Sequence, residues 1–340
     1  MDRPGASPDI DAVITWVDGG DPAHRRKLHA FLADSEQGRK PAAADPTRFG
    51  DCGEIEYCVA SLLRHASWLR TVHIVSDSQT PDLLAKLRGT PFEQRVQLVD
   101  HAEIFAGYEQ FLPTFSSLSI ETMLWRIPGL AERFIYLNDD FQLLRPVATE
   151  DFFRDGGVVL RGKWRNGRQR LLAQRLRAIL SSAWRSGKPD QASNHAAQQL
   201  TAAMVGFEEN YFQVPHCPHP MRRSILAGYF AAHPKHLAAN LAFRLRSAGQ
   251  FLLVSIADHL ELKAGSAIID NGLGTLRLKP SSQGWARLRR QLARADSDER
   301  IAFGCVQSLD VVGDATRKLV FEWLDRRIGR LDALLSPPSR

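Results

Sequence analysis

The chain has 340 residues, of which 44% are hydrophobic and 24% are charged, and its formal net charge is +6. This balance is typical of globular domains and excludes the disordered and fibrous classes. The length suffices for one large α/β domain or two modest ones with a substantial core. Because 38 acidic residues accompany 44 basic ones, the small positive excess favours anionic partners without naming one.

The first half of the chain alternates apolar strands with helical segments. We expect buried strands over residues 9–17, 71–75, 96–99 and 133–137. We expect helices over residues 22–34 and 53–66, from Pro81 onward and over residues 120–126, with a loop over residues 35–46. Strands that alternate with helices predict a mostly parallel, doubly wound sheet of the α/β class.

Three of the predicted strands end in acidic turns. Asp18 and Asp21 follow the first strand, Asp77 follows the second, and Asp139 and Asp140 follow the last. In parallel α/β sheets, ligands bind beyond the carboxyl ends of the strands. The acidic turns therefore predict a ligand site at this edge of the sheet.

The turn Asn138-Asp139-Asp140 is the best local candidate for chemistry. Adjacent carboxylates can hold a divalent cation, which neutralises the charge of a diphosphate. The alternative interpretation is a solvated acidic turn. Trp16-Val17-Asp18-Gly19 offers an aromatic platform for a base and a glycine that lets backbone amides approach phosphates. Its alternative is a core tryptophan followed by an ordinary Asp-Gly turn.

Two later motifs are also candidates. Pro215-His216-Cys217-Pro218-His219 holds two histidines in a rigid loop, and histidine suits proton transfer near neutral pH. Alternatively, these histidines only bond to backbone groups of the loop. Arg244 and Arg246 are two residues apart, so only one is expected to face a given site, where its planar fork would suit a phosphate. The alternative is a solvated pair. The chain has no GxGxxG and no GxxxxGK[ST], which argues against dinucleotide enzymes and P-loop NTPases.

The remaining features concern location and a charged segment. Cys52, Cys58, Cys217 and Cys305 show no CxxC spacing, which favours reduced thiols over disulfides or a cysteine zinc site. We find no apolar signal region at the start and no stretch near the roughly 20 apolar residues that span a bilayer, so we expect a cytoplasmic protein. Residues 161–189 are rich in arginine and lysine and contain no acidic residue.

In family order, these motifs resemble the Stealth family of sugar-1-phosphate transferases. That family includes bacterial capsular polysaccharide hexose-1-phosphate transferases and the animal lysosomal-enzyme N-acetylglucosamine-1-phosphotransferase. The resemblance is strong from Asp11–Pro22 and from Arg48–Tyr57 through Phe134–Phe141. It is looser over residues 215–219, 243–247 and 305–310, which are similar to the third and fourth family regions.

The resemblance implies a reaction and a set of roles. An acceptor hydroxyl would attack the phosphorus that carries the sugar of a UDP-sugar, and UMP would leave. His216 would be the base, with His219 as the competing choice, and Arg246 would hold the diphosphate. Asp139, Asp140 and Asp310 would bind Mg²⁺ or Mn²⁺. The nucleotide pocket would be lined by Thr15, Trp16, Val17, Asp18, Gly19 and Asp77.

Three positions depart from the family pattern. Ser116 stands where an asparagine is common, and its hydroxyl makes fewer hydrogen bonds than an amide. Leu309 precedes Asp310 where an asparagine is usual, and it cannot bind metal or phosphate. Gly50 replaces a residue that is usually charged. These changes bear on sugar and acceptor specificity more than on the reaction type.

We therefore expect a Rossmann-like, GT-A-like nucleotide-diphospho-sugar transferase sheet. It would comprise a nucleotide-sugar-binding α/β part over residues 1–160, a basic helical insertion over 161–190 and a mainly helical remainder over 191–335. The expected function is transfer of a hexose-1-phosphate, such as N-acetylglucosamine-1-phosphate, in capsule or cell-wall polysaccharide synthesis. Its partners would be a UDP-sugar, a glycan or lipid-linked acceptor and an anionic inner membrane surface, but no nucleic acid. The alternatives are a metal-dependent glycosyltransferase that releases UDP, or a non-catalytic protein that binds sugar nucleotides or polyanions.

Overall fold

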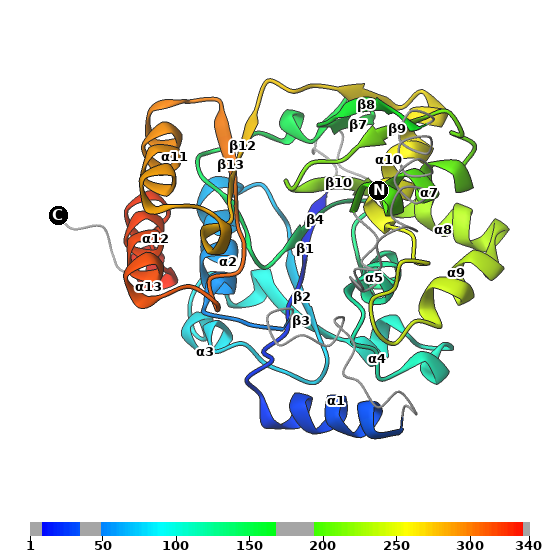
Figure 1. The fold of residues 1–340 in the computed structure, drawn as a ribbon, viewed down its shortest axis with the longest axis horizontal. Coiled ribbons are helices and arrows are strands. Elements are labelled where there is room, and N and C mark those ends of the chain that lie inside the picture. The colour runs from blue at the N-terminus through cyan, green and yellow to red at the C-terminus, as the bar shows by residue number, and fades with distance from the viewer. Residues whose placement is uncertain (1–8, 35–48, 168–193, 336–340) are drawn as a thin grey trace, which may run out of the picture.

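The computed structural model describes residues 9–34, 49–167 and 194–335 (Figure 1). Its central sheet contains five strands in the order β10-β4-β1-β2-β3. The parallel strands are β1 (Ile10–Thr15), β2 (Val72–Ser76), β3 (Val96–Asp100) and β4 (Arg133–Asn138), and β10 (His219–Arg222) is antiparallel to β4. The four predicted strands and the α/β class with a parallel, Rossmann-like sheet are confirmed.

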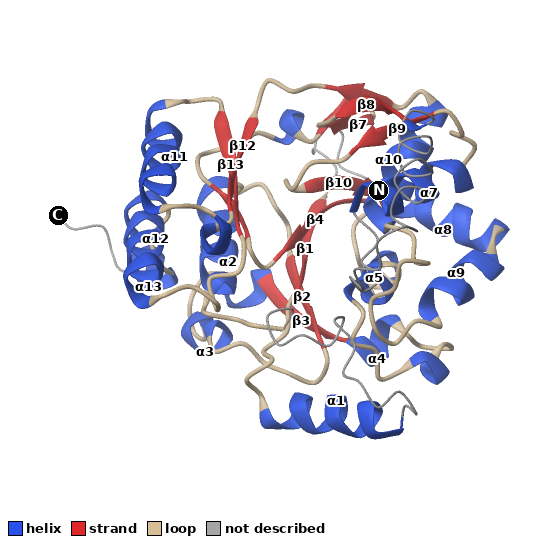
Figure 2. Cartoon of the chain, in the orientation of Figure 1, coloured by secondary structure: helices blue, strands red, loops and turns tan. Residues whose placement is uncertain are grey.

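Helices cover both faces of this sheet (Figure 2). One layer contains α2 (Glu54–His65), α3 (Leu83–Leu87), α11 (Trp285–Ser297), α12 (Asp314–Arg327) and α13 (Leu331–Leu335). The other contains α4 (His101–Ile104), α5 (Ser117–Glu121), α7 (Asn194–Met204), α8 (Arg223–Ala232), α9 (Pro234–Leu241) and α10 (Leu253–Ala264). Helix α1 (Pro22–Asp34) follows β1, as predicted. Short 3-10 helices are η3 (Glu93–Arg95), η4 (Glu109–Phe111), η5 (Leu124–Arg126), η6 (Thr149–Asp151) and η7 (Pro280–Ser282).

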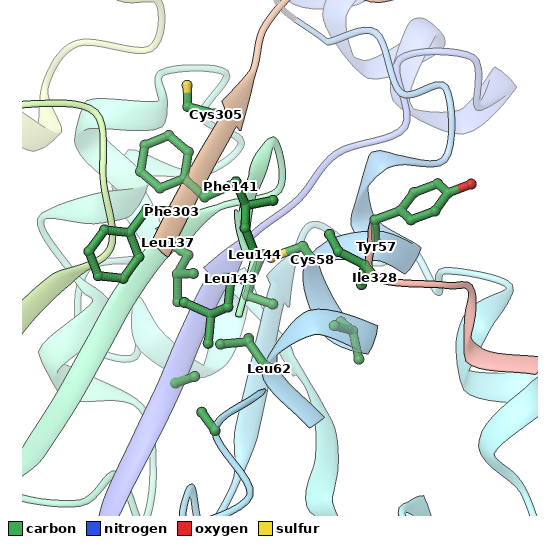
Figure 3. Packing of buried hydrophobic residues seen from close by; sticks show 14 of the residues in the cluster. Tyr57, Cys58, Leu62, Leu137, Phe141, Leu143, Leu144, Phe303, Cys305 and Ile328 are labelled. Atoms are coloured by element: carbon green, nitrogen blue, oxygen red, sulfur yellow. The ribbon is translucent and has the colours of Figure 1, made fainter. Parts of the chain in front are cut away.

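The sheet separates two hydrophobic cores, because successive strand residues point to opposite faces. Ala12 and Ile14 of β1 lie in one core, and Val13 between them lies in the other. Figure 3 shows part of the first core, where Leu62 of α2 lies near Leu137 of β4. Burial of these apolar surfaces fixes α2 and the strands on which the acidic turns are built.

Three smaller sheets were not predicted. One pairs β5 (Phe141–Leu143), β13 (Ile301–Val306) and β12 (Gly274–Leu278). A second pairs β6 (Phe153–Arg154), β7 (Gly157–Leu160) and β11 (Ala267–Ile269), and the third pairs β8 (Lys163–Asn166) with β9 (Asn210–Gln213). These strands are short, and most of them pair with segments far away in sequence, so no local pattern marks them.

Strand β8 bears on the predicted basic helical insertion over residues 161–190. Residues 163–166 form a strand rather than a helix, because they pair with β9. Residues 168–190 of the insertion lie outside the described residues, as does the whole loop predicted over residues 35–46. The part from residue 191 onward contains the helices that we expected, but also the strands β9 to β13.

An ion pair between the buried Asp11 and the exposed Arg70 fixes the end of β1 that lies opposite the acidic turns. Arg70 donates from Nε and Nη2 to the carboxylate of Asp11, at 2.9 and 2.6 Å. His73 lies 3.3 Å from the same carboxylate, and the amide of Ala131 donates to it at 2.8 Å. Burial alone would raise the pKa of Asp11, but the hydrogen bonds from His73, Arg70 and Ala131 lower it to about 2. Asp11, although part of the first motif, therefore has a structural role.

The last described segment of the chain forms two helices, α12 and α13. α12 ends at Arg327, and Gly329, with φ of 78°, allows the turn into α13. The apolar side chains Val320, Trp323 and Leu324 are buried in the first core. This apolar face is therefore occupied by the protein itself. Among the helices within the described residues, none has both the length and the apolar character to cross a bilayer.

Candidate active site

A cavity of about 510 Å³ lies at the carboxyl ends of the parallel strands. Segments that follow β1, β2 and β4 line it, together with the loop before β10 and residues 306–310. The predicted site residues in its wall are Thr15, Trp16, Val17, Asp77, Asp139, Asp140, His216, His219, Arg246 and Asp310. The structure thus brings together residues that are up to about 300 positions apart, at the edge where ligands bind in parallel α/β sheets.

Asp18 and Gly19 do not line this cavity. The carboxylate of Asp18 accepts a hydrogen bond from the amide of Gly20 at 2.6 Å, so it stabilises its own turn. Gly19 donates from its amide to the carbonyl of Phe49 at 2.6 Å. The turn thus supports the wall of the cavity rather than forming part of it.

Gly19 allows a close approach to Phe49. A β-carbon at position 19 would lie 2.5 Å from both the Cβ and the carbonyl oxygen of Phe49. We expect Gly19→Ala to lower the free energy of unfolding by about 1–3 kcal/mol, because backbone must move to remove this overlap. Urea unfolding measures the loss. Gly228→Ala is the matched control, since that helical glycine has open space around it and alanine favours helix. An equal loss in both variants would contradict the role given to Phe49.

Hydrogen bonds to two distant segments of the chain fix the turn from β4 to β5. The carbonyl of Asp140 accepts from the amide of Val306 at 2.9 Å, and Ser61 Oγ accepts from the amide of Leu143 at 2.9 Å. Phe141 and Leu143, which follow the turn, are buried in the first core. The carboxyl groups of Asp139 and Asp140 are therefore presented at a rigid corner of the cavity.

These two carboxyl groups lie in an environment that opposes negative charge. Burial raises the pKa of Asp140 to about 7, and one of its oxygens, Oδ1, is buried without a hydrogen-bond partner in the described part of the chain. Burial, with the negative charges of Asp140, Asp51 and Glu54, raises the pKa of Asp139 well above its ordinary value. Burial also raises the pKa of Glu54 to about 7. A cation would relieve this repulsion and satisfy the unpaired oxygen.

The donor set suits a hard divalent cation that keeps other oxygen ligands. Within the described residues, no three or more acidic, histidine or cysteine side chains are grouped so that they could enclose a metal ion. Mg²⁺ typically binds one or two carboxylates and completes its octahedron with water and substrate phosphate oxygens. The carboxyl groups of Asp139 and Asp140 fit that mode of binding, which leaves most positions on the ion for other oxygen ligands.

Asp310 lies against Gly50, which explains one departure from the family pattern. A β-carbon at position 50 would lie 2.8 Å from Cγ of Asp310. The Asp310 side chain thus occupies the space that a side chain at position 50 would need. Leu309, the other departure, is fully buried in the first core and has a packing role.

Both candidate histidines line the cavity, but their surroundings differ. His219 belongs to β10 and is buried, with its ring centroid 6.4 Å from that of Tyr136 and 6.2 Å from that of Phe141. His216 lies in the preceding loop and is half-buried. Burial lowers the pKa of His219 to about 3, and burial with the nearby Arg277 and Arg246 lowers the pKa of His216 to about 4. Both imidazoles are therefore neutral near pH 7, and His216 is the more accessible one.

Only one arginine of the predicted pair faces the cavity. Arg244 donates from its guanidinium to the backbone carbonyls of Pro113 and Gln110. Arg246 lines the cavity. Its charge lowers the pKa of His216, after the larger effect of burial, so the two side chains lie within electrostatic reach of each other.

Sequence reasoning missed other residues of the wall. Glu121 on α5 is buried, and burial raises its pKa to about 7, against smaller opposite effects of Arg246 and the Tyr136 hydroxyl. The Tyr136 hydroxyl donates to Oδ1 of Asn138 at 2.7 Å and lies 3.1 Å from the hydroxyl of Thr15. Because successive side chains of β4 point to opposite faces of the sheet, the sequence could have indicated which face Tyr136 occupies. Glu121 carries no local signal, because its place depends on the packing of α5.

Trp16 and Asp77, which were predicted to line a nucleotide pocket, also have partners within the protein. The indole N–H of Trp16 donates to Oδ2 of Asp51 at 2.9 Å, and the Trp16 side chain is mostly buried. Asp77 forms an ion pair with Lys27, whose Nζ lies 2.9 Å from Oδ1. Trp16 therefore orients the acidic segment near residue 51 while one of its edges reaches the cavity.

The fold and this cavity define an α/β protein with carboxyl groups, histidines and an arginine at the carboxyl edge of its sheet. Residues 8–36 match Stealth protein conserved region 1, and residues 48–160 match conserved region 2. The chain thus carries the first two conserved regions of Stealth proteins, and the resemblance predicted from the sequence is confirmed.

Curated relatives agree with this match. An exopolysaccharide phosphotransferase of Streptomyces coelicolor is 43% identical over 150 residues, which is 44% of this chain and 24% of that protein. A capsular polysaccharide phosphotransferase of Actinobacillus suis is 37% identical over 151 residues, 44% of this chain and 39% of its own. A second Streptomyces coelicolor exopolysaccharide phosphotransferase is 31% identical over 74% of this chain and 25% of its own length. The match thus spans about a quarter to two fifths of these relatives.

Solved structures that cover most of this chain are more distant. An active-site mutant of LgtC is 14% identical, with a TM-score of 0.43 over 97% of this chain and 98% of that one. Mouse xyloside xylosyltransferase 1 is 11% identical, with a TM-score of 0.38 over 87% of this chain and 97% of that one.

Proposed function

We propose that the chain is a phosphotransferase that moves a hexose-1-phosphate from a UDP-sugar to a glycan hydroxyl and releases UMP. The observation that carries this proposal is the cavity whose wall contains paired carboxyl groups, a neutral histidine and an arginine. The names of the relatives, capsular and exopolysaccharide phosphotransferases, support it. We place the reaction in capsule or cell-wall polysaccharide synthesis.

The proposed step is a displacement at the phosphorus that carries the sugar. The acceptor oxygen forms a bond to this phosphorus, the bond from phosphorus to the bridging oxygen breaks, and UMP leaves with that oxygen. His216 takes the proton of the acceptor hydroxyl, because its imidazole is neutral and accessible. Arg246 binds the diphosphate through its planar guanidinium. Transfer of this kind depends mainly on positioning and charge neutralisation.

Asp139 and Asp140 would hold the divalent cation, Mg²⁺ or Mn²⁺, and Asp310, the third ligand expected from the sequence, lines the same cavity. When bound, the cation would supply charge neutralisation for the diphosphate and the leaving phosphate. Glu121 is a buried acid of the cavity wall, and the charge of Arg246 acts on its carboxyl group. Thr15, Trp16, Val17 and Asp77 line the part of the cavity that we assign to the nucleotide.

The released nucleotide tests this proposal directly. We expect UMP when the protein is incubated with magnesium, a panel of UDP-sugars and glycan primers, with mass spectrometry as the measurement. A displacement at phosphorus leaves the second phosphate on the sugar, so the nucleotide product carries only one. Release of UDP would instead indicate a glycosyltransferase that attacks the sugar carbon. Tight UDP binding without turnover would indicate a sugar-nucleotide-binding protein.

A cytoplasmic location and a peripheral contact with an anionic inner membrane surface complete the proposal. The buried apolar face of α12 restricts such a contact to charged side chains. Arg326 is exposed in the last turn of α12, and basic residues near a membrane surface attract anionic lipids. Lipid-linked glycan is an acceptor that such a contact would bring close.

A further inference from the structure

Two histidines of the cavity wall have no part in the proposed step. His24 lies in the first turns of α1, and His101 is the first residue of α4. Their exposed fractions are 6% and 5%, so both side chains are buried. Among the residues that the structure describes, Nδ1 and Nε2 of His24 and Nδ1 of His101 have no hydrogen-bond partner. Buried polar groups are normally paired, so these nitrogens indicate a missing ligand.

The two histidines lie far from the carboxyl groups of Asp139 and Asp140. α1 and α4 lie on the β3 side of the molecule, whereas the acidic turn follows β4 (Figure 1). β3 and β4 are three steps apart in the sheet, which corresponds to roughly 14 Å. If the cation and the diphosphate bind at β4, a nucleoside extending along the strand ends reaches the histidines.

Two aromatic rings lie beside His24, although the charges of Asp77, Asp21, Lys27 and Asp18 also act on it. Its ring centroid lies 5.3 Å from that of Phe49 and 5.6 Å from that of Phe115. Both phenylalanines, with Val17, also line the cavity. Rings and aliphatic carbon next to unpaired ring nitrogens match a planar heterocycle that carries polar groups along one edge.

The charge state of the two histidines favours a nucleobase over a phosphate as their ligand. Burial lowers the pKa of His24 below its ordinary value, and it lowers the pKa of His101 to about 4. A neutral imidazole offers one N–H donor and one bare nitrogen acceptor. Such a pair can both donate to and accept from the edge of a base, but it gives no net charge to attract a phosphate. The cationic neighbour, Lys27, is already paired with Asp77.

We propose that His24 and His101 bind the nucleobase of the donor nucleotide by hydrogen bonds to its polar edge. This inference rests on the proposed function, since it takes the ligand of the cavity to be a nucleotide. It makes His24 and His101 residues that set base specificity, at the opposite end of the cavity from the residues of the displacement.

Isothermal titration calorimetry with single ligands tests the inference. The probes are UMP, CMP, AMP, GMP and ribose 5-phosphate, which lacks a base. We expect the wild-type protein to bind at least one of the nucleotides tenfold or more tightly than ribose 5-phosphate. We expect His24→Ala and His101→Ala each to reduce this ratio by roughly tenfold, the effect of losing one buried hydrogen-bonding partner. The affinity for ribose 5-phosphate should not change.

His29→Ala is the matched control, because His29 is exposed on the same helix as His24 and should leave every affinity unchanged. Thermal unfolding of each variant checks the fold. His24→Gln and His101→Gln keep a polar side chain and are measured if an alanine variant unfolds.

The inference is overturned if folded His24 and His101 variants keep the full preference for nucleotides over ribose 5-phosphate. It is also overturned if their affinity for ribose 5-phosphate falls by the same factor as their affinity for the nucleotide. It is also overturned if the wild-type protein binds no nucleotide better than ribose 5-phosphate. The proposed function fails separately. Base-dependent nucleotide binding without UMP release contradicts the transfer reaction alone, whereas UMP release with an unchanged preference in the variants contradicts the histidine assignment alone.

Discussion

His216→Ala is expected to lower the rate of sugar-phosphate transfer by about 10²- to 10⁴-fold and to leave nucleotide affinity unchanged. The imidazole is neutral at ordinary pH, because burial and the positive charges of Arg277 and Arg246 lower its pKa to about 4. The neutral imidazole can therefore take the proton of the acceptor hydroxyl without having to be deprotonated first. Initial rates of UMP release, with UMP affinity measured by calorimetry, separate loss of chemistry from loss of binding.

The pH dependence of the wild-type protein gives a second measurement of His216. Its pKa in the folded protein, about 4, lies below the ordinary value of 6.5. The unfolded chain therefore binds this proton more readily, so folding stability decreases as pH falls from 6.5 towards 4. His216→Ala should remove this part of the acid sensitivity. Because the base form persists down to about pH 4, transfer should show no decline between pH 8 and 6 that depends on His216.

His219 provides the contrast. It is buried between Tyr136 and Phe141 on β10, so we expect His219→Ala to lower the unfolding temperature, whereas His216→Ala should not. His29→Ala, on the exposed face of α1, should change neither rate nor stability. A folded but inactive His219→Ala, together with an active His216→Ala, would exchange the roles of the two histidines.

The sequence predicted the parts of the fold that have a local pattern. The parallel strands show as apolar runs, and each ends in a polar turn, so the edge that carries Asp77, Asp139 and Asp140 could be located. The antiparallel strand β10 could not, because His219–Arg222 contains a proline and follows an irregular loop. Its pairing with β4 places His219 beside Tyr136, and this contact is visible only in three dimensions.

The functions of individual residues were harder to predict than their positions. Trp16 and Gly19 stand where a nucleotide contact was predicted, yet the indole binds Asp51 and the glycine packs against Phe49. His24 and His101 had no motif of their own, because each lies on a helix whose place against the cavity depends on tertiary packing. Local patterns thus locate the strand ends, while the side walls of the cavity come from contacts between distant segments.

Asp140→Asn is expected to abolish transfer while stabilising the protein in the absence of metal. Replacing the carboxylate by an amide removes a ligand for the cation, so UMP release with magnesium should fall by at least about 100-fold. The same change removes a negative charge from a site where burial raises the pKa to about 7. In the presence of EDTA at pH 8, we expect the variant to gain about 2–4 kcal/mol in free energy of unfolding, allowing for partial exposure of the residue.

The size of this stability difference depends on pH in a defined window. The folded pKa of Asp140, about 7, lies above the ordinary value of 3.8, so the folded protein holds this proton more tightly than the unfolded chain. Wild-type stability from this group is complete below pH 3.8 and is lost as pH rises to 7. The stability of wild-type protein and variant should therefore be similar at pH 4 and diverge up to pH 7.

Urea unfolding at pH 4, 6 and 8, with EDTA or with magnesium and UMP, measures both effects. Magnesium with UMP should stabilise the wild-type protein and not Asp140→Asn, because only the carboxylate can contribute a charged ligand to the cation. Asp82→Asn changes an exposed carboxyl group and should leave stability and rate unchanged. A variant that is less stable than the wild type at pH 8 in EDTA would show that the Asp140 carboxylate is satisfied by the protein itself. The raised pKa of Asp140 would then be wrong, and no unsatisfied negative charge at the turn between β4 and β5 would favour cation binding.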